Sequence, residues 1–306
     1  MEKVGIITAS DFTDLDGYAC AIAYNELLKL EGKDSEIIIP GKINASVTDE
    51  IRSWKVDFLK KPSPETKTFI SVDNSYIKII PDYAIDNLIE IYDHREWDKE
   101  FWQQRIGDGA HIETLGAAAT QIWEEFIKRG KEKEISQISA RLLYTAIICN
   151  TLNFTAKNTK KRDIKAAKQL LKISDLPKDW VEKYFADWEK EILKDPYQAI
   201  INDTKEHHFY EGIGKRVTMG QLELWDSEKF VLENEETIKK AVANFGSEFW
   251  FFNAPSISKG TSFIVTDNDY IKDLLSKEFG VKFEKDIGKT DRVIERKEYM
   301  DRFLKL

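Results

Sequence analysis

Acidic and histidine side chains follow several apolar segments near the start of this chain. Asp14 and Asp16 come directly after the segment VGIITA, Asp73 ends KTFISVD, and Asp93 with His94 ends LIEIYDH. Carboxylates that converge repel one another unless a cation lies among them, and a histidine nitrogen shifts the preference from Ca toward Mn, Co or Zn. These residue types therefore indicate a divalent metal site.

The elements that must position these residues alternate along the first half. Short runs rich in β-branched residues (VGIITA, SEIIIP, KTFISVD, LIEIYDH) are separated by stretches of helical length and spacing (GYACAIAYNELLKL, GAAATQIWEEFIKRG, ISARLLYTAIIC). The alternation predicts βαβ units in a mainly parallel, Rossmann-like sheet with helices on both faces. Ligands bind such sheets beyond the carboxyl ends of the strands, so the three acidic strand ends can converge there. The small residues Gly17, Ala19 and Ala21 would let a helix start lie close to the site.

The second half has a different pattern of charged and apolar segments. A charged helical stretch, residues 182–199, is interrupted by Pro196 and contains the expected connector. Beyond it, RVTMGQLELWD, SEFWFFNAPSI and TSFIVTDND alternate with amphipathic helices such as DNDYIKDLLSKEFG. We therefore expect an α/β protein with a catalytic domain at 1–185, a connector at 186–199 and a smaller C-terminal α/β domain at 200–306.

Composition limits the partners. The net charge of −8 is interspersed along 306 residues, so no basic surface for duplex nucleic acid or an anionic membrane is visible. Cys20 and Cys149 lie in apolar contexts, which suggests buried reduced thiols in a reducing compartment. MEKVGIITAS meets Asp11 too soon for a signal peptide, and no apolar run reaches about 18 residues. We expect a cytoplasmic protein without membrane partners; the sequence leaves the oligomeric state open, a homodimer included.

Each motif taken alone has an ordinary structural explanation. A pair such as Asp14 and Asp16 after a strand is usually a turn with a helix N-cap, and SVDN at a strand end is common turn chemistry. A single histidine such as His94 is more often structural than a ligand. The functional interpretation depends on three strand ends carrying such groups in one βαβ array.

The order of the motifs TDLD, SVDN, YDHRE, IETLGAAAT and ICNTLNF resembles that of the DHH phosphoesterase superfamily. The second half is similar to the companion domain of one branch, through NDTKEHHFYEGIGKRVTMGQLE, FIVTDND and VIERKEYM. This branch comprises manganese-dependent family II inorganic pyrophosphatases and prune-like short-chain exopolyphosphatases. The resemblance covers nearly the whole chain and implies a hydrolase that cleaves acid anhydrides.

The resemblance implies a set of metal ligands. Asp14 would belong to one ion, Asp16 and His94 to the other, and Asp73 would bridge them, while Asn150 stands where the family has a carboxylate ligand of the second ion. The implied cofactors are divalent ions, Mn with Co or Mg as alternatives. Two ions about 3.5–4 Å apart would activate an attacking water and stabilise the in-line displacement at phosphorus.

Cationic residues complete the implied site. Arg95 takes the place of the second histidine of the Asp-His-His signature and would stabilise charge on the transferring phosphoryl group, so Arg95 and Asp73 are the implied catalytic residues. Lys205, Arg296 and Lys297 match the residues that bind substrate phosphates. Without the resemblance, these three would be interpreted as solvated surface charges.

Three positions depart from the family pattern and keep alternatives open. Ser10 aligns with a metal-binding histidine, Asn150 replaces a carboxylate, and Glu298 falls where a further basic residue is common. The expected function is hydrolysis of pyrophosphate or short-chain polyphosphate in a cleft between two domains. The alternatives are a small-nucleotide phosphodiesterase of the same superfamily and a catalytically impaired homologue that binds phosphate ligands or regulates.

Overall fold

The computed structural model of the chain describes residues 3–306. The chain divides into two compact units. The first comprises the residues up to Phe154 together with Asn158–Tyr184, and the second comprises Thr155–Lys157 with Phe185–Leu306. Residues 186–199, the expected connector, are largely helical and belong to the second unit. The functional domain boundaries expected from the sequence stay a prediction.

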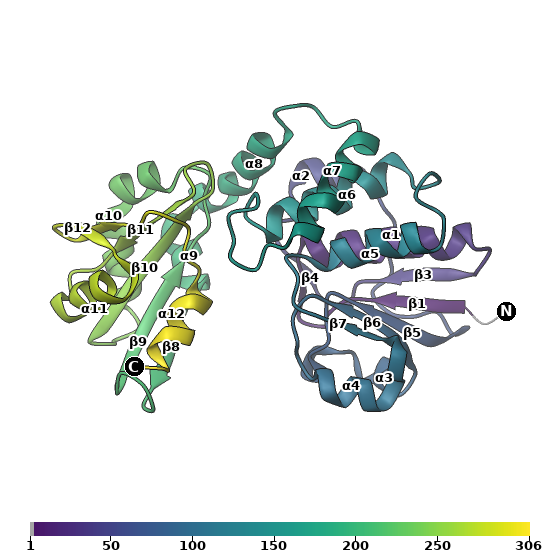
Figure 1. Cartoon of the computed structure of the whole chain (residues 1–306), viewed down its shortest axis with the longest axis horizontal. Coiled ribbons are helices and arrows are strands. Elements are labelled where there is room, and N and C mark those ends of the chain that lie inside the picture. The colour runs from purple at the N-terminus through teal and green to yellow at the C-terminus, as the bar shows by residue number, and fades with distance from the viewer. Residues whose placement is uncertain (1–2) are drawn as a thin grey trace. The chain divides into compact units, whose positions relative to one another are not determined.

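The first unit is built on a five-stranded parallel sheet (Figure 1). Its order is β3-β1-β5-β6-β7, with the bounds β1 (Lys3–Ile7), β3 (Ser35–Ile38), β5 (Thr66–Val72), β6 (Leu88–Asp93) and β7 (Ala110–Ile112). After β1 the chain goes first to one side, to β3, and then to the other, to β5. The topological switch point therefore lies between β1 and β5, where ligands bind open α/β sheets.

Helices cover both faces of this sheet, with α1 and α5 on one side and α3 and α4 on the other (Figure 1). The remaining short pair, β2 (Phe12–Thr13) and β4 (Lys42–Ile43), is also parallel. The helices are α1 (Leu15–Leu30), α2 (Asp49–Arg52), η1 (Ile77–Ile79), α3 (Asp82–Ile85), α4 (Lys99–Ile106), η2 (Gly107–Gly109), α5 (Ala118–Lys128), α6 (Gln137–Asn150) and α7 (Lys161–Ser174).

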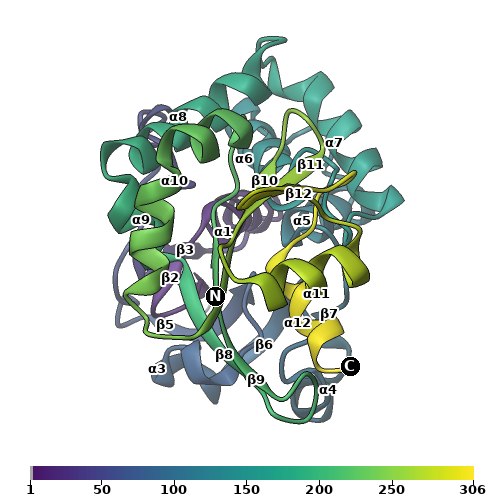
Figure 2. The same cartoon turned by 90° about the vertical axis from the view of Figure 1, so that its left-hand side faces the viewer.

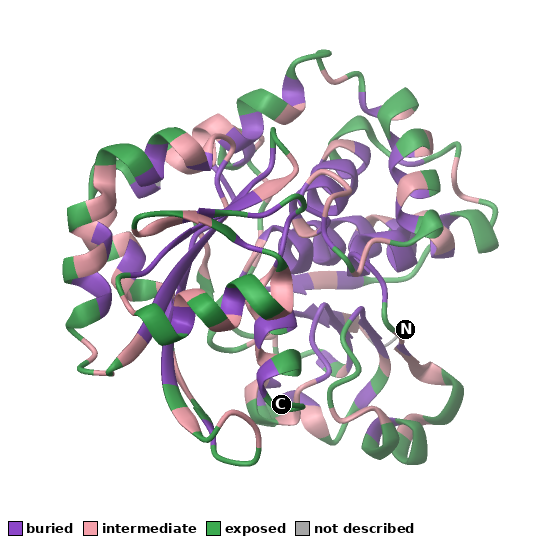
Figure 3. Ribbon diagram, turned by 60° about the vertical axis from the view of Figure 1, so that its left-hand side comes forward, coloured by how far each residue is buried: buried purple, intermediate pink, exposed green. Residues whose placement is uncertain are grey.

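Helices cover both faces of the sheet, so the side chains on both faces of its strands are buried and mostly apolar. Ile7, Ile38, Phe69 and Ile91 pack with Trp102 of α4 in one buried cluster. Such strands form nearly continuous apolar runs rather than alternating with polar residues. The burial of the strands in both units is visible in Figure 3.

The second unit contains a six-stranded mixed sheet (Figure 2). Its order is β12-β13-β11-β10-β9-β8, and only the β9–β10 pair is parallel within this described sheet. The strands are β8 (Thr204–Phe209), β9 (Lys215–Gln221), β10 (Phe249–Ser256), β11 (Thr261–Val265), β12 (Lys282–Glu284) and β13 (Ile287–Lys289). The helices are α9 (Pro196–Asn202), α10 (Ser227–Ala243), α11 (Asp269–Phe279) and α12 (Arg296–Phe303); the division between the units falls within α8 (Trp180–Lys194).

The side chains of β10 alternate between the two faces of this sheet, and each face has its own hydrophobic core. Trp250 and Phe252 pack in the cluster that contains Phe230 of α10, whereas Phe251 packs with Tyr299 of α12. Successive side chains of a strand point to opposite faces, so each face receives its own helices. The predicted fold class, a parallel Rossmann-like sheet plus a smaller C-terminal α/β domain, is confirmed.

Among residues 3–306, none of the helices combines the length and the apolar composition that crossing a membrane requires.

Candidate metal centre

Asp14 lies after the short strand β2, near the carboxyl end of β1, where it caps helix α1. Its Oδ1 accepts hydrogen bonds from the backbone N–H groups of Asp16 (3.0 Å) and Gly17 (3.1 Å). This is the ordinary N-cap arrangement, in which a carboxylate satisfies otherwise orphaned donors of the first helical turn. One acid of the pair therefore performs the structural role that its position suggests.

Asp16 is completely buried and is surrounded by donors. Its Oδ2 accepts from the backbone N–H of Ala118 (2.7 Å) and from Nδ2 of Asn150 (2.7 Å), and its Oδ1 accepts from the backbone N–H of Ala119 (2.9 Å). These bonds favour the carboxylate, but burial has the larger effect and raises the pKa of Asp16 above its ordinary value. The start of α5 therefore points two N–H groups at this acid, a contact that the sequence did not reveal.

Asp73 follows β5 on the opposite side of the switch point. It has a positive φ of 55° and is 7% exposed. Burial raises its pKa well above the ordinary value, the positive charge of Arg95 opposes that rise, and Asp14 and Asp16 add to it. A Cβ at Gly17 would make an ordinary van der Waals contact with Oδ2 of Asp73, at 3.5 Å, so the start of α1 lies close to this carboxylate.

His94 points its imidazole at both acids. Its Nδ1 lies 3.2 Å from the carbonyl oxygen of Leu115, which can only accept, so Nδ1 carries the proton. Nε2 lies 3.5 Å from Oδ1 of Asp73 and 3.9 Å from Oδ2 of Asp16, where it can coordinate a metal ion placed among them. A carbonyl bonded to the other ring nitrogen is the usual way in which proteins orient a metal-binding histidine.

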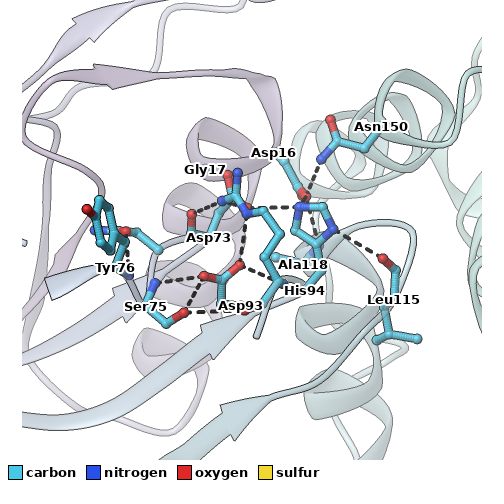
Figure 4. Close-up of polar contacts among 12 residues, drawn as sticks. Asp16, Gly17, Asp73, Ser75, Tyr76, Asp93, His94, Leu115, Ala118 and Asn150 are labelled. Atoms are coloured by element: carbon cyan, nitrogen blue, oxygen red, sulfur yellow. Dashed lines mark hydrogen bonds and ion pairs between the residues drawn. The ribbon is translucent and has the colours of Figure 1, made fainter. Parts of the chain in front are cut away.

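Asp16, Asp73 and His94 together can hold a metal ion (Figure 4). Their ligand atoms lie within 4.8 Å of one another, and all three side chains are buried. The pKa of each carboxyl is raised by burial, so a divalent cation among them would stabilise the charged forms that burial disfavours. Two oxygens and one imidazole nitrogen suit Mn, Co or Zn better than Ca.

Arg95 lies beside this group and is held by Asp93. Asp93 is completely buried; its Oδ2 accepts from N and Oγ of Ser75 (both 2.7 Å), and its Oδ1 accepts from N (3.0 Å) and Nε (3.2 Å) of Arg95. Nη2 of Arg95 donates to the carbonyl oxygen (2.5 Å) and to Oδ1 (2.8 Å) of Asp73. Asp93 thus anchors the arginine rather than joining the metal group.

The other residues expected near the metals have different partners. Asn150, at the end of α6, uses its amide nitrogen as a donor to Asp16. Ser10 is exposed. Of the expected ligands, Asp16, Asp73 and His94 bring their ligand atoms together in the part of the chain that the structure describes, whereas Asp14 caps α1 and Asn150 donates to Asp16.

The cationic residues expected to bind phosphate lie in the second unit. Lys205 is exposed on β8, and Lys297 is exposed in α12. Nη2 of Arg296 donates to the backbone oxygen and to Oδ1 of Asp203 (both 2.5 Å), while its buried Nε has no partner among the described residues. Burial lowers the pKa of His207, and the charges of Arg296 and Lys205 lower it further, so the two cations share one neighbourhood.

Asp163, in the first turn of α7, is a structural acid that the sequence analysis missed. Completely buried, it accepts from the backbone N–H groups of Gly116 (3.0 Å) and Lys160 (2.7 Å) and from Oγ1 of Thr120 (2.6 Å). A Cβ at Gly116 would lie 2.7 Å from Oδ2 of Asp163, so only glycine fits there. The position of Asp163, three residues after the N-cap Lys160, was the one local signal, since a carboxylate there often caps the helix.

Comparison with curated proteins gives manganese-dependent inorganic pyrophosphatases among the relatives. The chain is 26% identical to a probable manganese-dependent inorganic pyrophosphatase of Bacillus licheniformis, over 97% of this chain and 96% of that protein. It is 28% identical to the manganese-dependent inorganic pyrophosphatase of Methanocaldococcus jannaschii, over 77% of this chain and 78% of that protein. No family model matches the chain.

Solved structures give the same fold. The chain superposes on a putative family II inorganic pyrophosphatase of Methanococcus jannaschii with a TM-score of 0.64 and 23% identity, and the match covers 98% of each chain. The resemblance inferred from the motifs is thereby confirmed.

Proposed function

We propose that this protein is a metal-dependent phosphoanhydride hydrolase that cleaves pyrophosphate or short-chain polyphosphate, with manganese as its cofactor. The group of Asp16, Asp73 and His94 at the topological switch point carries the proposal. It is supported by relatives named manganese-dependent inorganic pyrophosphatases that match nearly the whole chain.

The side chains divide the work as follows. Asp16, Asp73 and His94 would hold a divalent ion, which when bound supplies Lewis-acid activation of the attacking water and of the phosphoryl group. Asp93 fixes the guanidinium of Arg95 at the edge of the group. Arg95 has 43% of its side chain exposed, and its Nη1 can donate to a phosphoryl oxygen and stabilise the charge that develops there, while Nε and Nη2 stay on Asp93 and Asp73.

Lys205, Arg296 and Lys297 are the proposed substrate ligands. Arginine suits bidentate contact with phosphate, and lysine supplies a point charge. Lys205→Ala should raise the KM for pyrophosphate, because one positive charge for the substrate is lost. The manganese content of the protein should stay unchanged, because a lysine ammonium group does not bind a metal ion. A fall in manganese content instead would contradict this role.

The central experiment measures phosphate release from pyrophosphate and tripolyphosphate in Mn, Co or Mg. His94→Gln removes a proposed ligand and should lower kcat at least a hundredfold. His111→Gln is the matched control, since His111 stacks on Tyr92 (ring centroids 4.5 Å apart) in the same sheet and lies outside the metal group. Equal rates for the two variants would refute the site.

The same assay separates the two alternatives. A small-nucleotide phosphodiesterase would release product from dinucleotides faster than from pyrophosphate. A binding or regulatory homologue would bind metal and pyrophosphate without turnover. This outcome is tested because Asn150 stands in place of a carboxylate and Ser10 in place of a histidine, and both are weaker metal ligands.

We propose the cytoplasm as the compartment and keep a homodimer as a prediction. Cys20 and Cys149 are both buried, as expected for thiols that stay reduced. Light scattering on the purified chain would measure its molar mass directly.

A further inference from the structure

We infer that this site holds one divalent ion, bound by Asp16, Asp73 and His94, and that the guanidinium of Arg95 takes the place of a second ion. The inference rests on the proposed function and deepens it, because it replaces the two ions that the motif order implies with one ion and one fixed organic cation.

The first observation is that Arg95 is locked in position. Its backbone N and Nε both donate to Oδ1 of Asp93, and the other oxygen of Asp93 is held by Ser75. Asp93 is completely buried, so its charge is uncompensated unless the guanidinium stays in place. The terminal Nη2 is thereby directed at Asp73.

The second observation concerns Oδ1 of Asp73, which has two neighbours. Nη2 of Arg95 lies 2.8 Å from it, and Nε2 of His94 lies 3.5 Å from it. An ion in the group with His94 and Asp16 fits on one side of this carboxylate. On the other side, a second divalent ion would face the positive guanidinium at close range in a partly buried site, where such repulsion is weakly screened.

The third observation is the shortage of ligands for a second ion. A pocket of about 330 Å³, counted with its open mouth, is lined by Asp11, Asp14, Asp73 and Arg95. Oδ1 of Asp14 is occupied as the cap of α1. The acids that line this pocket do not form another group of three ligand atoms in the part of the chain that the structure describes.

Substitution of a metal ion by arginine has a chemical consequence. Guanidinium stays protonated at any ordinary pH, and Nη1 of Arg95 can still donate to a phosphoryl oxygen, so the arginine supplies charge without depending on metal supply. Activity should therefore depend on manganese concentration with a Hill coefficient of one.

The test is the number of ions bound per chain. Equilibrium dialysis with elemental analysis, and the electron paramagnetic resonance spectrum of Mn²⁺, should give one ion per wild-type chain with the six-line signal of an isolated ion. Two ions per chain, or the broadened spectrum of a coupled pair, would overturn the inference, and so would no binding.

Variants test the part that Arg95 plays. Arg95→His combined with Ser10→His, which restores the histidine that Ser10 replaces beside Asp11 and Asp14, should raise the stoichiometry toward two, whereas Arg95→Lys, which keeps the charge and protects folding, should retain one. Arg105→Ala is the matched control, an exposed arginine paired with Asp86, and should also retain one. A double variant that still binds one ion would overturn the role of Arg95. Phosphate release, measured separately, decides the proposed function whatever the stoichiometry.

Discussion

Asn150→Asp changes one donor into a negative charge beside a completely buried carboxylate. In the wild-type chain, Nδ2 of Asn150 lies 2.7 Å from Oδ2 of Asp16. A hydrogen bond to a charged group contributes about 1.5–3 kcal/mol. Two like charges about 4 Å apart repel by about 4 kcal/mol at an effective dielectric constant of 20, and protonation of one carboxyl limits that repulsion. The metal-free variant should therefore lose roughly 3–6 kcal/mol of unfolding free energy.

Metal should reverse the effect, because a divalent ion turns the added carboxylate from a repelling neighbour into a ligand. A hundredfold tighter affinity would add about 2.7 kcal/mol to the stabilisation by manganese. The control is Asn150→Ala, which loses the hydrogen bond without adding a charge and should cost about 1.5–3 kcal/mol in EDTA and gain no extra response to manganese.

The assay is urea unfolding of the wild-type chain and both variants, in EDTA and in saturating manganese. The reasoning is refuted if the Asp variant is as stable as the Ala variant in EDTA, or if manganese stabilises it no more than it stabilises the wild-type chain. Either result would mean that residue 150 does not sense the charge of Asp16.

Three further predictions concern stability. Chelation of manganese should lower the unfolding free energy by about 2.7 kcal/mol relative to a solution at 100 times the dissociation constant, measured by urea unfolding. Burial, with the like charge of Glu223 nearby, raises the pKa of Glu295 from 4.5 to about 7. The ionisation of Glu295 therefore opposes folding as the pH rises above 4.5, and fully so above about 7. Glu295→Gln should stabilise the chain by about 3 kcal/mol at pH 8 and hardly at pH 4.5, and a gain that does not depend on pH would contradict this. Asp163→Asn should cost about 1–2 kcal/mol, because a neutral amide oxygen replaces the carboxylate that accepts from the N–H groups of Gly116 and Lys160, while the Thr120 hydroxyl can turn to accept from the new amide nitrogen; an unchanged urea midpoint would contradict this.

The sequence predicted the frame of the site because that frame depends on local patterns. Apolar β-branched runs identify the strands, and parallel strands necessarily end at the same edge, so the meeting of Asp16, Asp73 and His94 followed from where each run stops. The pair Asp14 and Asp16 illustrates the limit: the pattern allows a cap or a ligand, and the structure uses the first acid as a cap and buries the second in the ligand group.

The rest depended on contacts between distant segments. In the sequence, Asp93 is one more acid at a strand end. The structure shows that Ser75 binds one of its oxygens and Arg95 the other, so Asp93 anchors Arg95. The bonds from the start of α5 to Asp16 span about 100 residues of sequence, and no local spacing records them. Which partner a buried acid finds is set by tertiary packing, which propensity and periodicity do not encode.

The most direct test of the account is to locate manganese in a crystal of the protein by anomalous scattering. The account predicts one strong peak per chain within coordination distance of Asp16, Asp73 and Nε2 of His94, with the guanidinium of Arg95 still on Asp73. A peak elsewhere, or no peak among these three side chains at saturating manganese, would contradict it.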